Sequence, residues 1–249
     1  MSALLTDKII FVACNTSLVG AGIVRSFLLE DATVIFPANN GQAITMLKEL
    51  MDDINTGKLV TLLTDYPDYD KAFEIVDTVM ERFGKIDIFI ICFDAPTATK
   101  GLTETGIMDW EKMIDRNITA FFVGARIVLS RMKEQGQGML VNIIGMNSSG
   151  NGTFLPLAGL SAAIQAEMTK VLYAEVKRFN IRCHNLLIVN LTATDICNTH
   201  STRAEENKEM TPAGIASYIM KLYTCEASDS EGIFIWLPAK PETGDINMQ

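Results

Sequence analysis

Residues 8–29, KIIFVACNTSLVGAGIVRSFLL, combine a short apolar run, a small polar turn and a second apolar pattern with helical spacing. The run 9–12 is β-branched and aromatic without a polar face, which is typical of a central parallel strand covered on both sides. Asn15, Thr16 and Ser17 supply helix-capping side chains before the helical pattern begins. The stretch therefore predicts a strand that leads into a helix, as at the start of a dinucleotide-binding unit.

The same alternation continues along the chain. Because strands alternate with helices, we predict an α/β fold with a doubly wound parallel sheet, Rossmann-like, in three α/β/α layers, as a single domain over residues 1–249. The predicted strands are 33–36, 60–64, 88–92, 139–144, an apolar strand after 179–185, and 229–237; the predicted helices are 42–54, 70–83, 109–132 and 157–178.

Composition narrows the class of protein. The chain is 48% hydrophobic with a net charge of −9, which argues against nucleic acid and anionic membranes as partners. No secretion signal or membrane-spanning run is visible. The five cysteines are scattered without C-x-x-C spacing, so neither a disulfide framework nor a metal site is predicted. We expect a protein of the reducing cytoplasm.

The first turn resembles that of the short-chain dehydrogenase/reductase (SDR) family, which reads T-G-x-x-x-G-x-G. Residues 13–20 read ACNTSLVG here, so Gly20 is kept while Cys14 and Leu18 replace the other two glycines. The resemblance implies cofactor-binding positions at Ser17 and Gly20. A leucine side chain beside a pyrophosphate is a steric obstacle, and we expect any such site to be weak or vestigial.

The next two strand ends carry little of the family's cofactor chemistry. An acid after the second strand would bind the ribose of NAD, but Ala38 and Asn39 stand there, and an ordinary loop explains them as well. Asp65 falls where the family often has an adenine-contacting aspartate, and it is equally plausible as a turn residue. We expect no cofactor, or NAD(P) if the catalytic groups lie elsewhere.

The resemblance also locates the family's catalytic Asn, Ser, Tyr and Lys. Asn117 matches the first, although a helix-interior Asn bonded to nearby backbone is the simpler interpretation. The Ser position is Gly145, and alignment on the following helix puts the Tyr and Lys positions at Ala158 and Ala162. In the family the Tyr hydroxyl passes a proton to or from the substrate, and the Lys one helical turn away lowers the pKa of that hydroxyl. Two alanines can do neither.

These losses lead to two competing functional hypotheses. The first is an SDR-fold pseudoenzyme that serves assembly or binds an unidentified small molecule. The alternative is an NAD(P)-dependent oxidoreductase with an atypical active site, in which Ser148, Ser149 or Ser161 takes another role. The resemblance is to an oxidoreductase, yet the chain's status as an enzyme stays open at this stage.

Two apolar helices predict a homo-oligomer, either a dimer or a tetramer. The apolar residues within 118–129 cannot all point at one sheet, and the helix from Leu157 carries no charge before Glu167. The resemblance implies pairing through the helices 109–132 and 157–178 and through the last strand, residues 233–237. Such pairing would cover apolar surface that a monomer exposes.

Overall fold

A seven-stranded parallel sheet forms the centre of the protein, with strand order β3-β2-β1-β4-β5-β8-β9. The structure is a computed structural model that describes residues 4–14, 18–63, 68–93, 101–145, 148–149, 153–154, 156–188, 210–224 and 234–237. The strands are β1 (Ile9–Cys14), β2 (Thr33–Ala38), β3 (Leu59–Leu63), β4 (Ile88–Cys92), β5 (Gly138–Gly145), β8 (Ile181–Ile188) and β9 (Phe234–Leu237), beside a separate antiparallel pair, β6 (Ser148–Ser149) and β7 (Thr153–Phe154).

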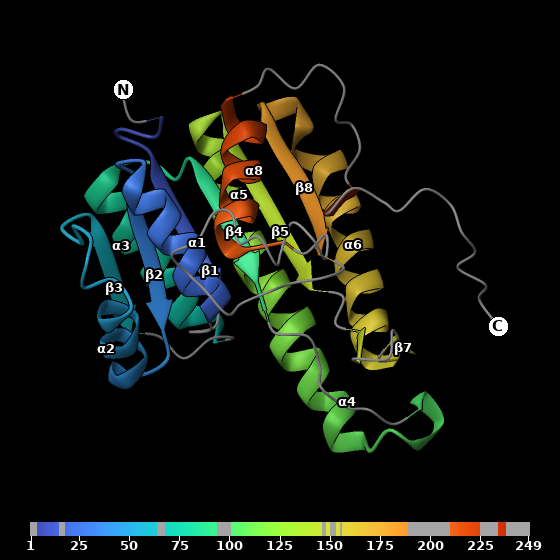
Figure 1. Cartoon of the computed structure of the whole chain (residues 1–249). Coiled ribbons are helices and arrows are strands. Elements are labelled where there is room, and N and C mark those ends of the chain that lie inside the picture. Colours follow the sequence, from blue (N-terminus) through green and yellow to red (C-terminus); the bar gives the residue numbers. More distant parts are fainter. Residues whose placement is uncertain are drawn as a thin grey trace.

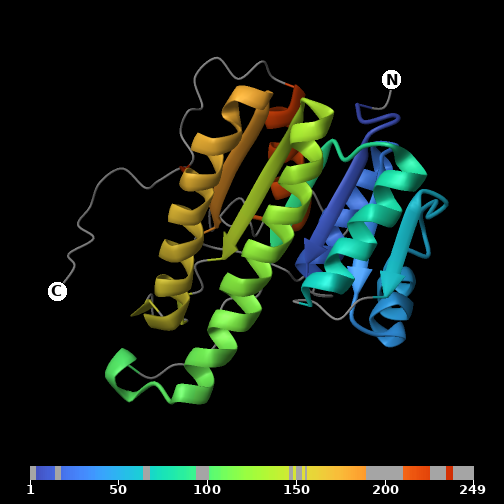
Figure 2. The same ribbon diagram turned by 180° about the vertical axis from the view of Figure 1, so that it is seen from behind.

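Helices cover both faces of this sheet. The helices α1, α2 and α8 lie on one face (Figure 1), and α3, α5 and α6 lie on the other, which Figure 2 shows from behind. This arrangement is the three-layer α/β/α fold predicted from the sequence. The helices are α1 (Leu18–Leu29), α2 (Gly41–Glu49), α3 (Tyr69–Phe83), α4 (Ile107–Met113), α5 (Ala120–Gln135), α6 (Pro156–Val176) and α8 (Pro212–Thr224), with short turns η1 (Leu102–Glu104), η2 (Ile114–Thr119) and η3 (Lys177–Phe179).

The strand side chains divide between two apolar cores. In β1, Ile10 and Val12 pack beneath α1, while Phe11 points to the opposite core and meets the edge of Phe89 at 5.5 Å between ring centroids. Alternation along each strand sends successive side chains to opposite faces. Since helices cover both faces, apolar side chains are favoured on both, which explains the unbroken apolar run of β1.

Three elements differ from their predicted form, and one of them is β8, which begins at Ile181 rather than after Asn185. The predicted helix 109–132 is divided into α4, a π-helical turn η2 and α5. Hydrophobic spacing shows only that a segment is helical, and one widened turn within it leaves the pattern almost unchanged. The second strand, expected to stop before Pro37, continues through it to Ala38, where it pairs with Leu63 of β3. The extended backbone near a strand end accommodates proline.

The flanks of α5 are covered within this one chain. The structure places α5 between α3 and α6 as well as on the sheet, so Phe121, Val123 and Val128 are buried without a partner. Of the apolar residues in 118–129, Phe122 alone is exposed, at 46%, and Ile118 is half-buried. The pattern on which the oligomer was predicted is therefore largely explained by neighbouring helices of the same chain.

Candidate functional site

The topology itself points to one crevice. The chain adds β2 and β3 on one side of β1 and then returns to place β4 and β5 on the other side. In open α/β sheets, ligands bind outside the carboxyl ends of the strands at such a reversal of strand order. The amino end of α6 reaches this edge of the sheet, and α4 extends beyond it in both views (Figures 1 and 2).

The positions aligned with the family's Ser, Tyr and Lys lie at this edge. Gly145 is the last residue of β5, in register with Ile188 at the end of β8. Ala158 and Ala162 lie one turn apart on α6, and both are buried. Ala162 belongs to a small apolar cluster with Ile144 and Ala166. Methyl groups therefore occupy the side of α6 on which a proton donor and its ammonium partner would be required.

Two hydroxyl groups on α6, those of Ser161 and Thr169, are held by their own helix. The Ser161 hydroxyl accepts a hydrogen bond from Nε2 of Gln165 at 3.1 Å, and the Thr169 hydroxyl donates to the Gln165 carbonyl at 2.9 Å. All three side chains are buried. Neither Gln165 nor Thr169 has a basic side chain that could take the proton of Ser161. The structure describes only the backbone of Ser148 and Ser149, so their predicted roles are untested.

Asn117 lies in the π-helical turn η2, which packs on α6. Its side chain is buried. That nearby backbone satisfies its carboxamide stays a prediction. Single π-turns inside helices occur frequently at functional sites, because they direct a side chain away from the regular helical face. Asn117 is the one matching position of the family's four catalytic residues that carries a polar side chain.

The cofactor side of the crevice is only partly described. Gly20 is buried in the first turn of α1, while Leu18, which begins this helix, is 40% exposed. Ala38 ends β2 and is buried, so it offers no polar group for a ribose. Ser17 and Asp65 lie outside the described residues, and the structure does not test their predicted cofactor contacts.

Two buried asparagines were not singled out from the sequence. Nδ2 of Asn142 on β5 donates to Oδ1 of Asn185 on β8 at 3.0 Å, and Asn185 in turn donates to the Ala166 carbonyl at 3.3 Å. Oδ1 of Asn142 has no hydrogen-bond partner among the described residues. The sequence offered one sign of these residues, an Asn within an otherwise apolar strand. The direction in which such a side chain points, however, depends on the sheet register. These amides join two strands to α6 beneath the crevice.

Among the described residues, the strongly perturbed titratable groups lie elsewhere. Burial raises the pKa of the Cys183 thiol to about 12, and burial together with the charge of Arg182 lowers the pKa of His184 to about 4. Burial and then Asp87 raise the pKa of Tyr223 to about 12. Active sites commonly concentrate such shifts. Here they occur along β8 and at the end of α8, rather than around Gly145 and α6.

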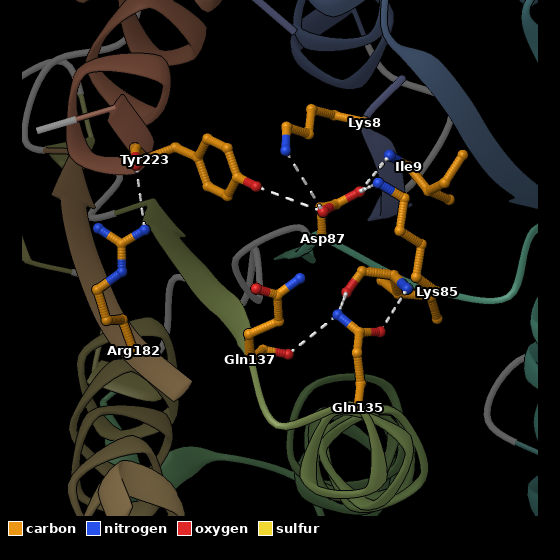
Figure 3. A network of polar contacts seen from close by, with 9 residues as sticks. Lys8, Ile9, Lys85, Asp87, Gln135, Gln137, Arg182 and Tyr223 are labelled. Carbon is orange, nitrogen blue, oxygen red and sulfur yellow. Dashed lines mark hydrogen bonds and ion pairs between the residues drawn. The ribbon is translucent and has the colours of Figure 1, made fainter. Parts of the chain in front are cut away.

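A buried carboxylate organises the opposite, amino edge of the sheet (Figure 3). Asp87 accepts hydrogen bonds from the backbone N–H of Ile9 at 2.8 Å and from the Tyr223 hydroxyl at 3.4 Å. Lys85 lies 3.0 Å and Lys8 4.0 Å from its oxygens. These partners come from β1, the turn before β4 and α8. Because the carboxylate is fully engaged by its own chain, the cluster fits a structural tie between these elements.

Other classes of site find no support in the described ranges. They contain no group of three or more His, Cys, Asp or Glu side chains that could hold a metal ion. No helix among them is both long and apolar enough to cross a membrane.

The strand order and the helices on both faces define an open, doubly wound α/β protein. A family model described as short chain dehydrogenase matches residues 8–207. The chain therefore belongs to the short-chain dehydrogenase/reductase family.

Individual relatives are distant. An uncharacterized oxidoreductase of Staphylococcus aureus strain USA300 is 22% identical over 220 residues, which are 88% of this chain and 92% of that protein. A short chain dehydrogenase of Bacillus anthracis has a similar structure, with a TM-score of 0.77, 20% identity, and coverage of 94% and 96% of the two chains. ElxO, solved with NADP bound, has a TM-score of 0.74 at 19% identity, covering 92% and 96%. At these identities the solved structures show a common fold.

Proposed function

We propose that this protein is a non-catalytic member of the SDR family, a pseudoenzyme of one domain that uses the fold for assembly or for binding a small molecule. The observation that carries the proposal is the buried face of α6, where Ala158 and Ala162 stand in the places of the proton donor and its lysine. Reduction of a carbonyl needs both a hydride and a proton. Neither Ala158 nor Ala162 can deliver the proton, and Gly145 has no side chain.

The competing function is an NAD(P)-dependent oxidoreductase with an atypical active site. The names of its relatives and the NADP bound to ElxO favour it. In that case Ser148, Ser149 or Ser161 would take another role in catalysis. A panel of carbonyl and alcohol substrates with both nicotinamides separates the two functions. Turnover on the order of 1 to 1,000 per second would refute the pseudoenzyme proposal, because those are ordinary enzyme rates.

The proposal extends to the cofactor, which we expect to bind weakly or not at all. Leu18 replaces a phosphate-approach glycine, Ala38 cannot bond a ribose, and Ala162 lacks the lysine's charge. Charge-assisted hydrogen bonds contribute about 1.5–3 kcal/mol each, so several losses shift a micromolar cofactor to millimolar affinity. Fluorescence titration with NADH and NADPH measures this directly. Saturation at micromolar concentration would contradict the proposal.

A designed replacement provides a matched comparison. Gly145 has open space where a Cβ would lie, so Gly145→Ser introduces the missing hydroxyl without displacing a neighbour. Combined with Ala158→Tyr and Ala162→Lys, it restores the family's catalytic side chains. We expect the triple variant to bind NADH or NADPH more tightly than the unmodified protein. Equal affinity in a folded triple variant would show that these positions do not control the cofactor site.

We also propose a homo-oligomer, dimer or tetramer, in the cytoplasm. Support comes from the exposed side chains of Phe122 on α5 and Val171 on α6, at 46% and 59% exposure. Phe122→Glu is the appropriate probe, because Phe121 is fully buried and a charge there would unfold the chain. Light scattering should give a multiple of 27.4 kDa for the native protein and a smaller mass for Phe122→Glu. A native mass of 27.4 kDa would contradict the proposal.

A further inference from the structure

Two cysteines that are distant in sequence end neighbouring strands. Cys14 is the last residue of β1, Cys92 is the last residue of β4, and the two are register partners in the parallel pair. Both side chains belong to the core beneath α1, so they leave the sheet on the same face. Cys14 is 8% exposed and Cys92 is half-buried. Their strands border the crevice where the strand order reverses.

The register places these thiols within bonding range. Adjacent strands lie about 4.8 Å apart, which falls inside the roughly 4.4–6.8 Å that separates the Cα atoms of disulfides. Because the two Cα–Cβ bonds are nearly parallel, the Cβ atoms stay slightly farther apart than an ideal disulfide prefers. The bond requires a small approach of two strand ends at Cys14 and Cys92, the last described pair of the β1–β4 ladder. A disulfide made under such a constraint is readily reduced.

We propose that Cys14 and Cys92 form a reversible disulfide by exchange with a low-molecular-weight disulfide such as oxidised glutathione. The more exposed Cys92 attacks one sulfur as its thiolate, and the first glutathione leaves as a thiolate. Cys14 loses its proton and attacks the sulfur of Cys92 in the resulting mixed disulfide, which releases the second glutathione. The protein dithiol is oxidised by two electrons, one external disulfide is reduced, and the two thiol protons pass to the glutathione products.

Cys183 provides an internal comparison. It is buried on β8 on the opposite face of the sheet, and its register partner on β5 is Leu140 rather than a second cysteine. Burial raises the pKa of its thiol to about 12, which leaves almost no thiolate at neutral pH. We therefore expect Cys183 to stay unmodified under conditions that oxidise the pair.

The consequence of the bond follows from its position. Oxidation would fix the separation of β1 and β4 at their carboxyl ends, where ligands of this fold class bind. The redox state of the pair would thus alter the ligand crevice. This inference does not depend on the absence of catalysis, because the two cysteines lie on different strands from Gly145 and on different elements from α6.

Peptide mapping tests the bond directly. The full chain is incubated with oxidised glutathione, quenched with acid, alkylated and digested with trypsin. Cleavage after Lys8, Arg25, Lys85 and Lys100 yields peptides 9–25 and 86–100, each with one cysteine. We expect these two peptides to appear joined, lighter than their sum by two hydrogens, and to separate again after dithiothreitol.

Single substitutions identify the role of each thiol. In Cys14→Ser we expect glutathione to remain on Cys92 as a stable mixed disulfide, whereas Cys92→Ser should leave Cys14 largely unmodified. Circular dichroism and urea midpoints check the fold, and Cys14→Ala replaces the serine variant if the buried hydroxyl unfolds it. The proposal is overturned if wild-type Cys92 keeps its glutathione, if neither thiol reacts, or if Cys92 joins Cys197 or Cys225 instead.

Discussion

His184 offers a direct test of the electrostatics of the core. The ring lies on β8 with 2% of its surface exposed, and neither Nδ1 nor Nε2 has a hydrogen-bond partner in the described structure. Burial, and then the positive charge of Arg182, lowers the pKa of the ring to about 4 from its ordinary 6.5. The imidazole is therefore neutral in the folded protein at pH 7, with one buried donor and one buried acceptor unmet.

The sign of the pH dependence follows from that lowered pKa. Above pH 6.5 the ring is neutral in both the folded and unfolded chain, and its contribution to stability is complete. As the pH falls from 6.5 towards 4, the unfolded chain takes up a proton that the folded chain does not. Integrating between these two values gives a loss of about 2 kcal/mol at pH 5 and ~3 kcal/mol below pH 4.

The perturbation is His184→Leu, which replaces the ring by an apolar side chain of similar size. At pH 7 we expect the free energy of unfolding to be unchanged or raised by about 1–3 kcal/mol, because two unmet polar atoms leave the core. At pH 5 the advantage of the variant over wild type should grow by about 2 kcal/mol. Urea unfolding at both pH values measures the difference, and effects of other titrating groups cancel between the two proteins.

Leu186→Ala is the matched control, since Leu186 lies two residues along β8 on the same face and is fully buried. Its cost of about 2–5 kcal/mol should be the same at pH 7 and pH 5, because no titrating group is removed. If His184→Leu also shows the same difference at both pH values, the ring keeps an ordinary pKa and the reasoning fails.

Other predictions concern the remaining features of the fold. Asp87→Ala leaves the Ile9 N–H and two lysines without their acceptor, and we expect it to lower the free energy of unfolding by about 3–5 kcal/mol in urea. Tyr223→Phe, which removes only the 3.4 Å hydrogen bond, should cost less than about 1 kcal/mol; an equal cost would mean that the hydroxyl anchors the cluster. Gly145→Ser alone should change the free energy of unfolding by less than about 0.5 kcal/mol, and a larger loss would contradict the open space beside that residue. Oxidation of the Cys14–Cys92 pair should raise the free energy of unfolding by about 4 kcal/mol, less any strain in the bond, because the disulfide closes a long loop. Unchanged urea midpoints after oxidation would count against this.

Local sequence pattern was sufficient to predict the class of fold. The periodicity of residues 8–29 is a local property, and it predicted β1 and α1 because strand and helix are each built from near neighbours in sequence. The four-residue spacing of Ala158 and Ala162 likewise placed both on one side of a helix before any packing was known. Ser17 and Asp65 remain predictions, since they lie outside the described residues.

Which distant residues meet depends on the packing of the whole chain. Sequence spacing gave no sign that Cys14 and Cys92 are neighbours, because strand order and register bring them together. The apolar helix α5 suggested a partner chain, whereas α3 and α6 cover most of it within the same molecule. Asn142 and Asn185 form a pair for the same reason as the two cysteines. Periodicity reports which face of an element is apolar, but the identity of the group against that face is set by the packing of the whole chain.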